Sequence, residues 1–168
     1  MDSDWEQLIR QCNSCTKCEL AYTRTNVVIG RGSLNARVML VGEGPGEQED
    51  LQGKPFVGAA GQLLNLLLTA LMFREEDYYI ANIVKCRPPG NREPYPEEAE
   101  KCLPFLRQQV KLIRPKIIVC MGNIATKYIL KENAGISKVR GQWQERKGFS
   151  IMPTFHPAAL LRDESKKV

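Results

Sequence analysis

The sequence predicts one α/β domain, a three-layer α/β/α sandwich around a central, mostly parallel four-stranded sheet. Short apolar strands alternate with amphipathic helices along the chain, a pattern typical of a parallel sheet covered by helices on both faces. The 168 residues, 43% of them hydrophobic, are enough for one buried core and include no repeat or low-complexity linker. We therefore expect a single domain over residues 1–168.

The first half of the chain predicts two helices and two strands. Residues 4–12 have the pattern of a short amphipathic helix and lead into a cysteine-rich turn. The stretch "RVMLVGEGPG" predicts a brief strand ending in a glycine-rich turn. Residues 59–72 have the length and leucine spacing of a buried helix. Residues 77–86 are rich in β-branched and aromatic side chains and predict the second strand.

The second half predicts two more helices and two more strands. Residues 96–114 form a long amphipathic pattern with a proline at its start and two glutamates in its first turn. "PKIIVCMG" and "FSIMPTFHP" predict strands, and "NIATKYILK" between them predicts a helix. Ligands of open parallel sheets bind beyond the carboxyl ends of the strands. Polar clusters follow all four strands, so we expect them to gather along one edge.

Composition bounds the class of protein. No run of 18 apolar residues is present, and the start "MDSDWEQ" lacks the basic and apolar regions of a secretory signal. We expect a cytoplasmic protein without membrane contact. In that reducing compartment, cysteines serve as ligands or free thiols before disulfides. The net charge of +5 suits an anionic partner, although this signal favours nucleic acid only weakly.

The six cysteines are Cys12, Cys15, Cys18, Cys86, Cys102 and Cys120. Cys120 lies inside an apolar strand and is expected to be a small buried hydrophobic residue. The first three form a C-x2-C-x2-C run, Cys86 follows a strand, and Cys102 lies early in a helix, so four thiolates can converge from three elements. Structural zinc usually has two tight knuckles, whereas the second pair here is widely spaced. Spacing alone leaves zinc and an iron–sulfur cluster equally favoured.

Five stretches together carry a resemblance to a known family: "CTKCELAYTRTNVVIGRG", "GEGPGEQEDLQGKPFVGAAGQLL", "ANIVKCRPPGNREP", "CLPFL" and "FHPAALLR". In this order, over nearly the whole chain, they resemble the family 4 uracil-DNA glycosylases, the iron–sulfur branch of the uracil-DNA glycosylase superfamily. The resemblance implies a DNA repair hydrolase that flips deoxyuridine out of DNA and hydrolyses the N-glycosidic bond. Its products would be free uracil and an abasic site.

The resemblance also implies a cofactor and a set of site residues. It assigns the ligands of a [4Fe-4S] cluster to Cys15, Cys18, Cys86 and Cys102. Cys12 falls outside this pattern, as a bystander that could substitute for a lost neighbour. The positions implied in catalysis are His156, Glu43, Asn82, Glu49 and Asn91. Those implied in the uracil pocket are Gly42, Glu43, Gly44, Phe56, Asn82 and His156.

The chemistry of the reaction agrees with these residue types. Uracil leaves as an anion, so a donor aimed at its O2, such as the imidazole of His156, stabilises the developing charge. A flipped base is stacked on an aromatic ring and recognised along its Watson–Crick edge, tasks that match Phe56 and Asn82. Gly44 has no carboxylate to activate water. Either Glu43, Glu49 or Asn91 orients the water, or the leaving group does most of the work.

The expected partner is uracil-containing DNA, single- or double-stranded, bound by a monomer. Lys85, Arg87, Arg92 and Arg162 follow predicted strands or lie near the same edge and are candidates to neutralise phosphates. Leu160 and Leu161 are candidates to fill the place of the flipped nucleotide. For each of these residues an ordinary surface or packing role is equally favoured.

Two departures and two alternatives accompany the resemblance. It implies one further helix beyond "DESKKV", where this chain stops. The chain has a single histidine and lacks the histidine-bearing insertion of the branch that traps DNA covalently, so we expect hydrolysis with turnover. The first alternative is a non-catalytic iron–sulfur or zinc DNA-binding module that senses damage. The second is a broader deaminated-base glycosylase that acts on hypoxanthine or xanthine.

Overall fold

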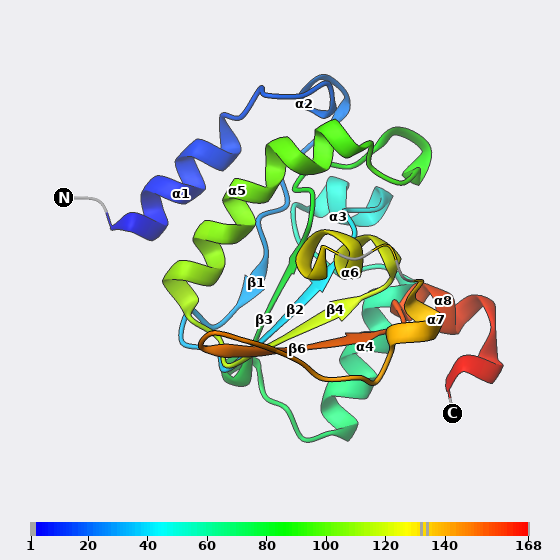
Figure 1. Ribbon diagram of the computed structural model, residues 1–168. Coiled ribbons are helices and arrows are strands. Elements are labelled where there is room, and N and C mark those ends of the chain that lie inside the picture. Colours follow the sequence, from blue (N-terminus) through cyan, green and yellow to red (C-terminus); the bar gives the residue numbers. More distant parts are fainter. Residues whose placement is uncertain (1–2, 132, 134, 168) are drawn as a thin grey trace.

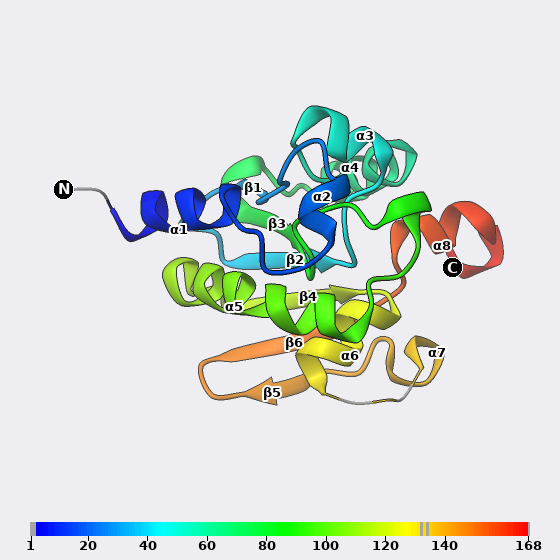
Figure 2. The ribbon, with the colours of Figure 1, turned by 90° about the horizontal axis from the view of Figure 1, so that it is seen from above.

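The computed structural model describes residues 3–131, 133 and 135–167, which form an α/β/α sandwich around a six-stranded sheet (Figure 1). The strands are β1 (Arg31–Gly32), β2 (Val38–Gly42), β3 (Tyr78–Asn82), β4 (Ile117–Met121), β5 (Gln144–Arg146) and β6 (Phe149–Thr154). Their order in the sheet is β1-β3-β2-β4-β6-β5. Strands β3, β2, β4 and β6 pair in parallel, whereas β1 and β5 are antiparallel strands at the two edges (Figure 2).

The predicted α/β class and the four central strands are confirmed, and the strand count was too low by two. The missed strands are the edge strands β1 and β5, which contain two and three residues. Their sequences, "RG" and "QER", are too short and too polar to show an alternating apolar pattern. They add width to the sheet without changing its parallel centre.

Helices cover both faces of the sheet. The α-helices are α1 (Asp4–Asn13), α2 (Leu20–Thr23), α3 (Glu47–Gln52), α4 (Ala59–Ala70), α5 (Pro96–Ile113), α6 (Asn123–Leu130), α7 (Ile136–Val139) and α8 (Pro157–Arg162). Three short 3-10 helices occupy Glu75–Asp77, Pro89–Asn91 and Glu164–Lys167. None of these described helices combines the length and apolar character that crossing a membrane requires. The predicted helices over 4–12, 59–72, 96–114 and the "NIATKYILK" stretch correspond to α1, α4, α5 and α6.

Each face of the sheet has its own core. On one face, Met39 and Cys120 from the strands pack with Leu106 of α5 and Ala125 of α6. On the other face, apolar strand residues such as Ile80 pack against α4. A third, smaller cluster joins α1 to α5, two helices that lie side by side (Figure 1). Cys120 is fully buried among these apolar side chains, as predicted.

Helix α4 is buried along only one stripe. Gly61, Leu64 and Leu68 face the core, whereas Leu66 is 68% exposed. Met72, just beyond the end of the helix, is 88% exposed. The sequence predicted a buried helix, and the structure buries this helix along one face only. As an outer layer of the sandwich, α4 turns only the side chains spaced three and four apart toward the sheet.

The parallel register brings the carboxyl ends of the central strands together. Gly42 at the end of β2 lies opposite Asn82 at the end of β3, and Met121 of β4 lies opposite Thr154 of β6. The polar segments that follow these strands therefore emerge along one edge of the sheet, as the sequence predicted. The candidate site lies there.

Candidate active site and thiol cavity

A cleft opens at the carboxyl edge of the sheet. Seven of the residues proposed for catalysis or base binding line it: Glu43, Gly44, Glu49, Phe56, Asn82, Asn91 and His156. Gly42 lies behind them, because a Cβ built on it would come within 2.6 Å of the Asn82 Oδ1 atom and 2.8 Å of the Phe56 ring. The fold thus brings together all eight residues named from the sequence.

His156 is the N-cap of α8, and this position sets its tautomer. Its Nδ1 atom accepts a hydrogen bond from the backbone N–H of Ala158 at 3.0 Å. Burial, helped by the charge of Arg162 and opposed by Glu49, lowers the pKa of His156 to about 4. The ring is therefore neutral at pH 7, and its proton is on Nε2 because Nδ1 is an acceptor. An Nε2–H donor remains for a ligand.

Phe56 provides an aromatic surface beside this histidine. The two rings stack with centroids 5.5 Å apart and an interplanar angle of 29°. Phe56 has a φ of 53°, an unusual conformation for a bulky residue. Gly61 permits it, because a Cβ at that position would lie 1.9 Å from the Phe56 carbonyl oxygen. Strained backbone of this kind concentrates at functional sites.

Asn82 ends β3 with its side chain in the cleft. The residue is 2% exposed, and its Oδ1 atom is buried without a hydrogen-bond partner among the described residues. An unpaired buried amide oxygen is unfavourable in the free protein. A ligand with an N–H group would satisfy it.

Glu49 holds the loop that carries Phe56. Its carboxylate accepts backbone N–H bonds from Gly46 at 3.1 Å, Val57 at 2.9 Å and Gly58 at 2.7 Å. These bonds fix the N-terminus of α3 and the residues on the C-terminal side of Phe56 to one another. The geometry therefore gives Glu49 a positioning role.

Glu43 and Asn91, the other two polar candidates, differ in their surroundings. Burial, and to a smaller degree the charge of Glu93, raises the pKa of Glu43 to about 7, while Arg162 opposes the shift. Asn91 uses its Oδ1 atom to accept from Arg87 Nε at 2.7 Å. A carboxyl group with this pKa is partly protonated at neutral pH.

The four basic residues proposed to contact phosphates differ in their surroundings, and Arg87 donates to Asn91. Lys85 is 1% exposed, with Nζ bound to Asn82 and Gln109, so a phosphate role for it was wrong. Arg92 forms a two-pronged ion pair with the buried Glu98 carboxylate, at 2.8 and 3.0 Å. Arg162 lines the cleft beside His156.

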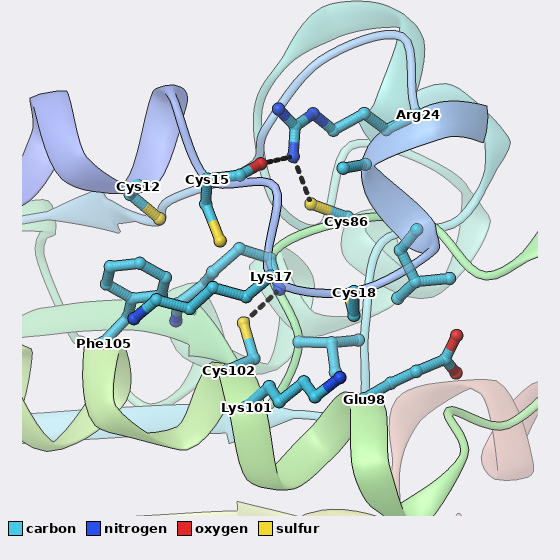
Figure 3. Close-up of a pocket in the computed structure, with 14 residues that line it drawn as sticks. Cys12, Cys15, Lys17, Cys18, Arg24, Cys86, Glu98, Lys101, Cys102 and Phe105 are labelled. Atoms are coloured by element: carbon cyan, nitrogen blue, oxygen red, sulfur yellow. Dashed lines mark hydrogen bonds between the residues drawn. The ribbon is translucent and has the colours of Figure 1, made fainter.

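Five cysteines line a second cavity, on the α1 and α5 side of the sheet: Cys12, Cys15, Cys18, Cys86 and Cys102. Figure 3 shows the labelled thiols of Cys12, Cys15, Cys86 and Cys102 pointing toward the same space. The four residues expected to be ligands, Cys15, Cys18, Cys86 and Cys102, all line this cavity. Cys12, expected to be a bystander, lines the same cavity and is 2% exposed.

Two sulfurs in this cavity accept hydrogen bonds. Arg24 Nη1 lies 3.4 Å from Cys86 Sγ, and the backbone N–H of Lys85 lies 3.3 Å from Cys102 Sγ (Figure 3). Burial raises the pKa of the Cys12 thiol to about 12 and that of Cys102 to about 11. These two thiols are therefore protonated at pH 7, and binding a metal centre through Cys102 would release its proton.

The spacing of these groups bears on the kind of centre that fits. Among the described residues, no three Cys, His, Asp or Glu side chains lie close enough to hold one metal ion. A single zinc draws its thiolates to about 2.3 Å from one point. The cysteines that line the cavity are the type of ligand that both zinc and iron–sulfur centres use.

Sequence reasoning missed several residues that shape the two sites. Ile136 and Ser137 of α7 line the cleft, and Gln109 of α5 binds Lys85. Helix α7 has four residues, too few for a periodic pattern. Gln109 lies on a helix that the sequence predicted, on the side that faces the core. The sequence pattern did not indicate that Lys85 is its hydrogen-bond partner.

The protein is an α/β/α sandwich with a polar cleft at the carboxyl edge of its sheet and a cysteine-lined cavity beside it. Comparisons with known proteins identify its family. A sequence model of the uracil DNA glycosylase superfamily matches residues 29–168, and the chain belongs to this family. Its relatives place it in the type-4 branch. The type-4 uracil-DNA glycosylase of Archaeoglobus fulgidus is 46% identical over 93% of this chain and 82% of its own length. That of Thermotoga maritima is 47% identical over 97% and 86%.

A relative from a different branch is more distant. The type-5 uracil-DNA glycosylase of Pyrobaculum aerophilum is 32% identical over 77% of this chain and 64% of its own length. The resemblance drawn from the sequence motifs is therefore confirmed at the level of the branch.

Proposed function

We propose that this chain is a uracil-DNA glycosylase that hydrolyses the N-glycosidic bond of deoxyuridine in DNA, leaving an abasic site. One observation carries the proposal. A single cleft combines an Nε2–H donor on His156, the ring of Phe56 and the unpaired amide oxygen of Asn82. Its type-4 relatives carry the same activity in their names.

The three side chains divide the work of recognising and releasing the base. A base inside a duplex is out of reach, so deoxyuridine is flipped into the cleft and stacked on Phe56. Asn82 Oδ1 accepts from uracil N3–H, and the Asn82 amide NH2 donates to O4. His156 donates to O2 as negative charge develops there. A donor aimed at a developing anion stabilises it most in a dry site, and the burial that dries this site also keeps the imidazole neutral.

Glu43 is the best candidate to orient the attacking water. Glu49 already accepts three backbone N–H bonds, and Asn91 accepts from Arg87. The pKa of Glu43 is about 7, close to the value at which a carboxylate accepts a proton most effectively under physiological conditions. We assign the proton-accepting role to Glu43 and a positioning role to Glu49.

The substrate is DNA, single- or double-stranded, bound by a monomer. Arg162 lies in the cleft and can neutralise a phosphate beside the flipped nucleotide. Leu161, 45% exposed on the same helix, can fill the vacated place in the stack. Because the phosphate contact is electrostatic, binding should weaken with increasing salt.

For the thiol cavity we propose a [4Fe-4S] cluster held by Cys15, Cys18, Cys86 and Cys102, supported by the family resemblance and by the cysteines that line the cavity. All six cysteines are free, which agrees with a reducing compartment such as the cytoplasm. When bound, a cluster supplies four covalent ties and redox-active iron. Here the thiols come from the N-terminal turn, the segment after β3 and α5, so the ties would hold these three elements together.

Release of free uracil from a deoxyuridine-containing oligonucleotide tests the proposed activity. We expect release with turnover, and a protein that binds this DNA without releasing base would be the non-catalytic module. Matched oligonucleotides with hypoxanthine or xanthine separate a uracil enzyme from a broader one. Protein purified without air should be brown, with absorbance near about 400 nm from the iron–sulfur cluster. A colourless protein with one zinc and no iron would contradict the cluster.

A further inference from the structure

Lys85 is, among the described residues, the largest side chain that is less than 2% exposed. No step proposed above uses it. A lysine side chain is almost never fully buried unless its ammonium group is paired with acceptors. Its Nζ donates to the backbone carbonyl of Asn82 at 2.8 Å and to Oε1 of Gln109 at 2.7 Å. Both acceptors are amide oxygens, so hydrogen-bond geometry holds this side chain in place.

The two acceptors connect Lys85 to the base-recognising end of β3. The carbonyl that it holds belongs to Asn82, the residue whose Oδ1 atom lies unpaired in the cleft. Gln109 is itself fully buried, and its Nε2 donates to the carbonyl of Ile29 at 2.9 Å and to Tyr79 Oη at 3.3 Å. This network fixes the backbone from which the Asn82 amide projects.

The main chain of Lys85 belongs to the other site. Its backbone N–H donates to Cys102 Sγ at 3.3 Å, and its carbonyl accepts from the backbone N–H of Val28 at 2.7 Å. Lys85 also lines the thiol cavity and precedes Cys86 in the chain. The main chain of Lys85 therefore contacts the thiol cavity, while its side-chain amine binds the backbone carbonyl of Asn82.

We propose that Lys85 is a positioning residue that holds Asn82 in the orientation needed to bind uracil, from a main chain anchored at the thiol cavity. The inference rests on the proposed function, because it assigns Asn82 to the base. Without the Nζ donor, the Asn82 carbonyl is left buried and unpaired, and the end of β3 relaxes. Base binding is then weakened, whereas contacts to the DNA backbone are kept.

The test is Lys85→Met, which keeps the length of the side chain and removes its donors. Lys101→Met is the matched control, because Lys101 also lines the thiol cavity but is exposed. We would measure the inhibition constant of free uracil, binding to abasic-site DNA and iron per chain. We expect Lys85→Met to raise the uracil inhibition constant about tenfold, equivalent to about 1.4 kcal/mol. Abasic-DNA binding and iron should be unchanged, and Lys101→Met should match the wild type.

An unchanged uracil inhibition constant in folded Lys85→Met would overturn the proposal. If that variant does not fold, Gln109→Met decides, because it removes the other partner of Nζ. We expect it to raise the inhibition constant about threefold, the effect of one modest hydrogen bond, and no increase would also overturn the proposal. Failure of the wild-type protein to release uracil would instead disprove the function itself, so the two failures are distinguishable.

Discussion

One short segment contributes to both sites, Asn82 to the cleft and Val84, Lys85 and Cys86 to the thiol cavity, yet the two sites are built differently. In the cleft, hydrogen bonds within the protein already orient His156 and Glu49. In the cavity, burial keeps Cys12 and Cys102 as neutral thiols, with pKa values of about 12 and 11. The fold preorganises polar groups of the cleft through hydrogen bonds, whereas these two cysteines of the cavity are held as buried, neutral thiols. Changes in the cleft should therefore alter chemistry, and changes in the cavity should first alter stability.

The largest loss of activity is expected for Asn82→Asp, a change within the cleft. The change removes the fixed NH2 donor to uracil O4 and leaves oxygens that accept from the cytosine amino group. A site built to bind one polar edge rejects a mismatched edge by about 10⁴-fold, so most uracil activity should be lost. Trace cytosine release should appear.

Both bases are measured from matched single-stranded oligonucleotides. Asn35→Asp serves as the control, because Asn35 is exposed and lies outside the cleft. Iron content should be equal in all three proteins, since the cavity is untouched. Undiminished uracil release by Asn82→Asp would show that this residue does not recognise the base.

His156→Ala should lower the rate of uracil release by roughly 10²- to 10³-fold, the range for removing one donor to a developing anion. Binding to uracil-containing DNA should survive, because stacking and phosphate contacts remain. Single-turnover rates and binding constants separate the two effects. If the variant lost its fold and kept its rate per folded molecule, the histidine would be structural.

The pH dependence should report Glu43 and not His156. The pKa of His156 is about 4, so the ring stays neutral from pH 5 to 8 and contributes no change there. The pKa of Glu43 is about 7, and only its ionised form accepts a proton. The rate should therefore fall as pH falls through 7, roughly tenfold per unit well below it. Glu43→Gln should remove this dependence, and a wild-type rate that is flat from pH 5 to 8 would exclude the role.

The cleft was predictable from the sequence because it follows a topological rule. Parallel strands place their carboxyl ends at one edge, so motifs after β2, β3 and β6 had to meet. The tautomer of His156 and the three bonds of Glu49 could not be predicted, because they depend on backbone groups placed by the fold. Burial of Lys85 was missed for the same reason, since a lysine in a polar motif normally predicts a surface charge.

The thiol cavity was predictable only in part. Resemblance supplied four ligands, and spacing alone left zinc and iron–sulfur equal. That Cys12 lines the same cavity depends on how α1 packs against α5 through Leu8 and Phe105. No pattern in the sequence specifies that packing. The identity of the bound centre stays a prediction that chemical analysis can test.

Cys86→Ala should break the cavity and reduce the yield of folded protein. Cys86 would tie the segment after β3 to the N-terminal turn, and it has Arg24 as a second partner at 3.4 Å. Iron per chain and soluble yield are the measurements, with Cys120→Ala as the control because Cys120 is a buried strand residue outside the cavity. A well-folded, fully active Cys86→Ala protein would contradict a structural role for the cluster.

Cys12→Ala should have the smallest effect, because Cys12 is not among the four assigned ligands. We expect unchanged iron and a loss of about 1 kcal/mol in the free energy of unfolding, from the deleted core sulfur. The backbone N–H of Cys15 donates to the carbonyl of Cys12 at 3.2 Å, so both side chains leave the same turn. Iron analysis of Cys12→Ala, Cys15→Ala and the double variant is therefore decisive. If Cys15→Ala keeps iron that the double variant loses, Cys12 substitutes for Cys15; if Cys12→Ala alone loses iron, the assigned ligand set is wrong.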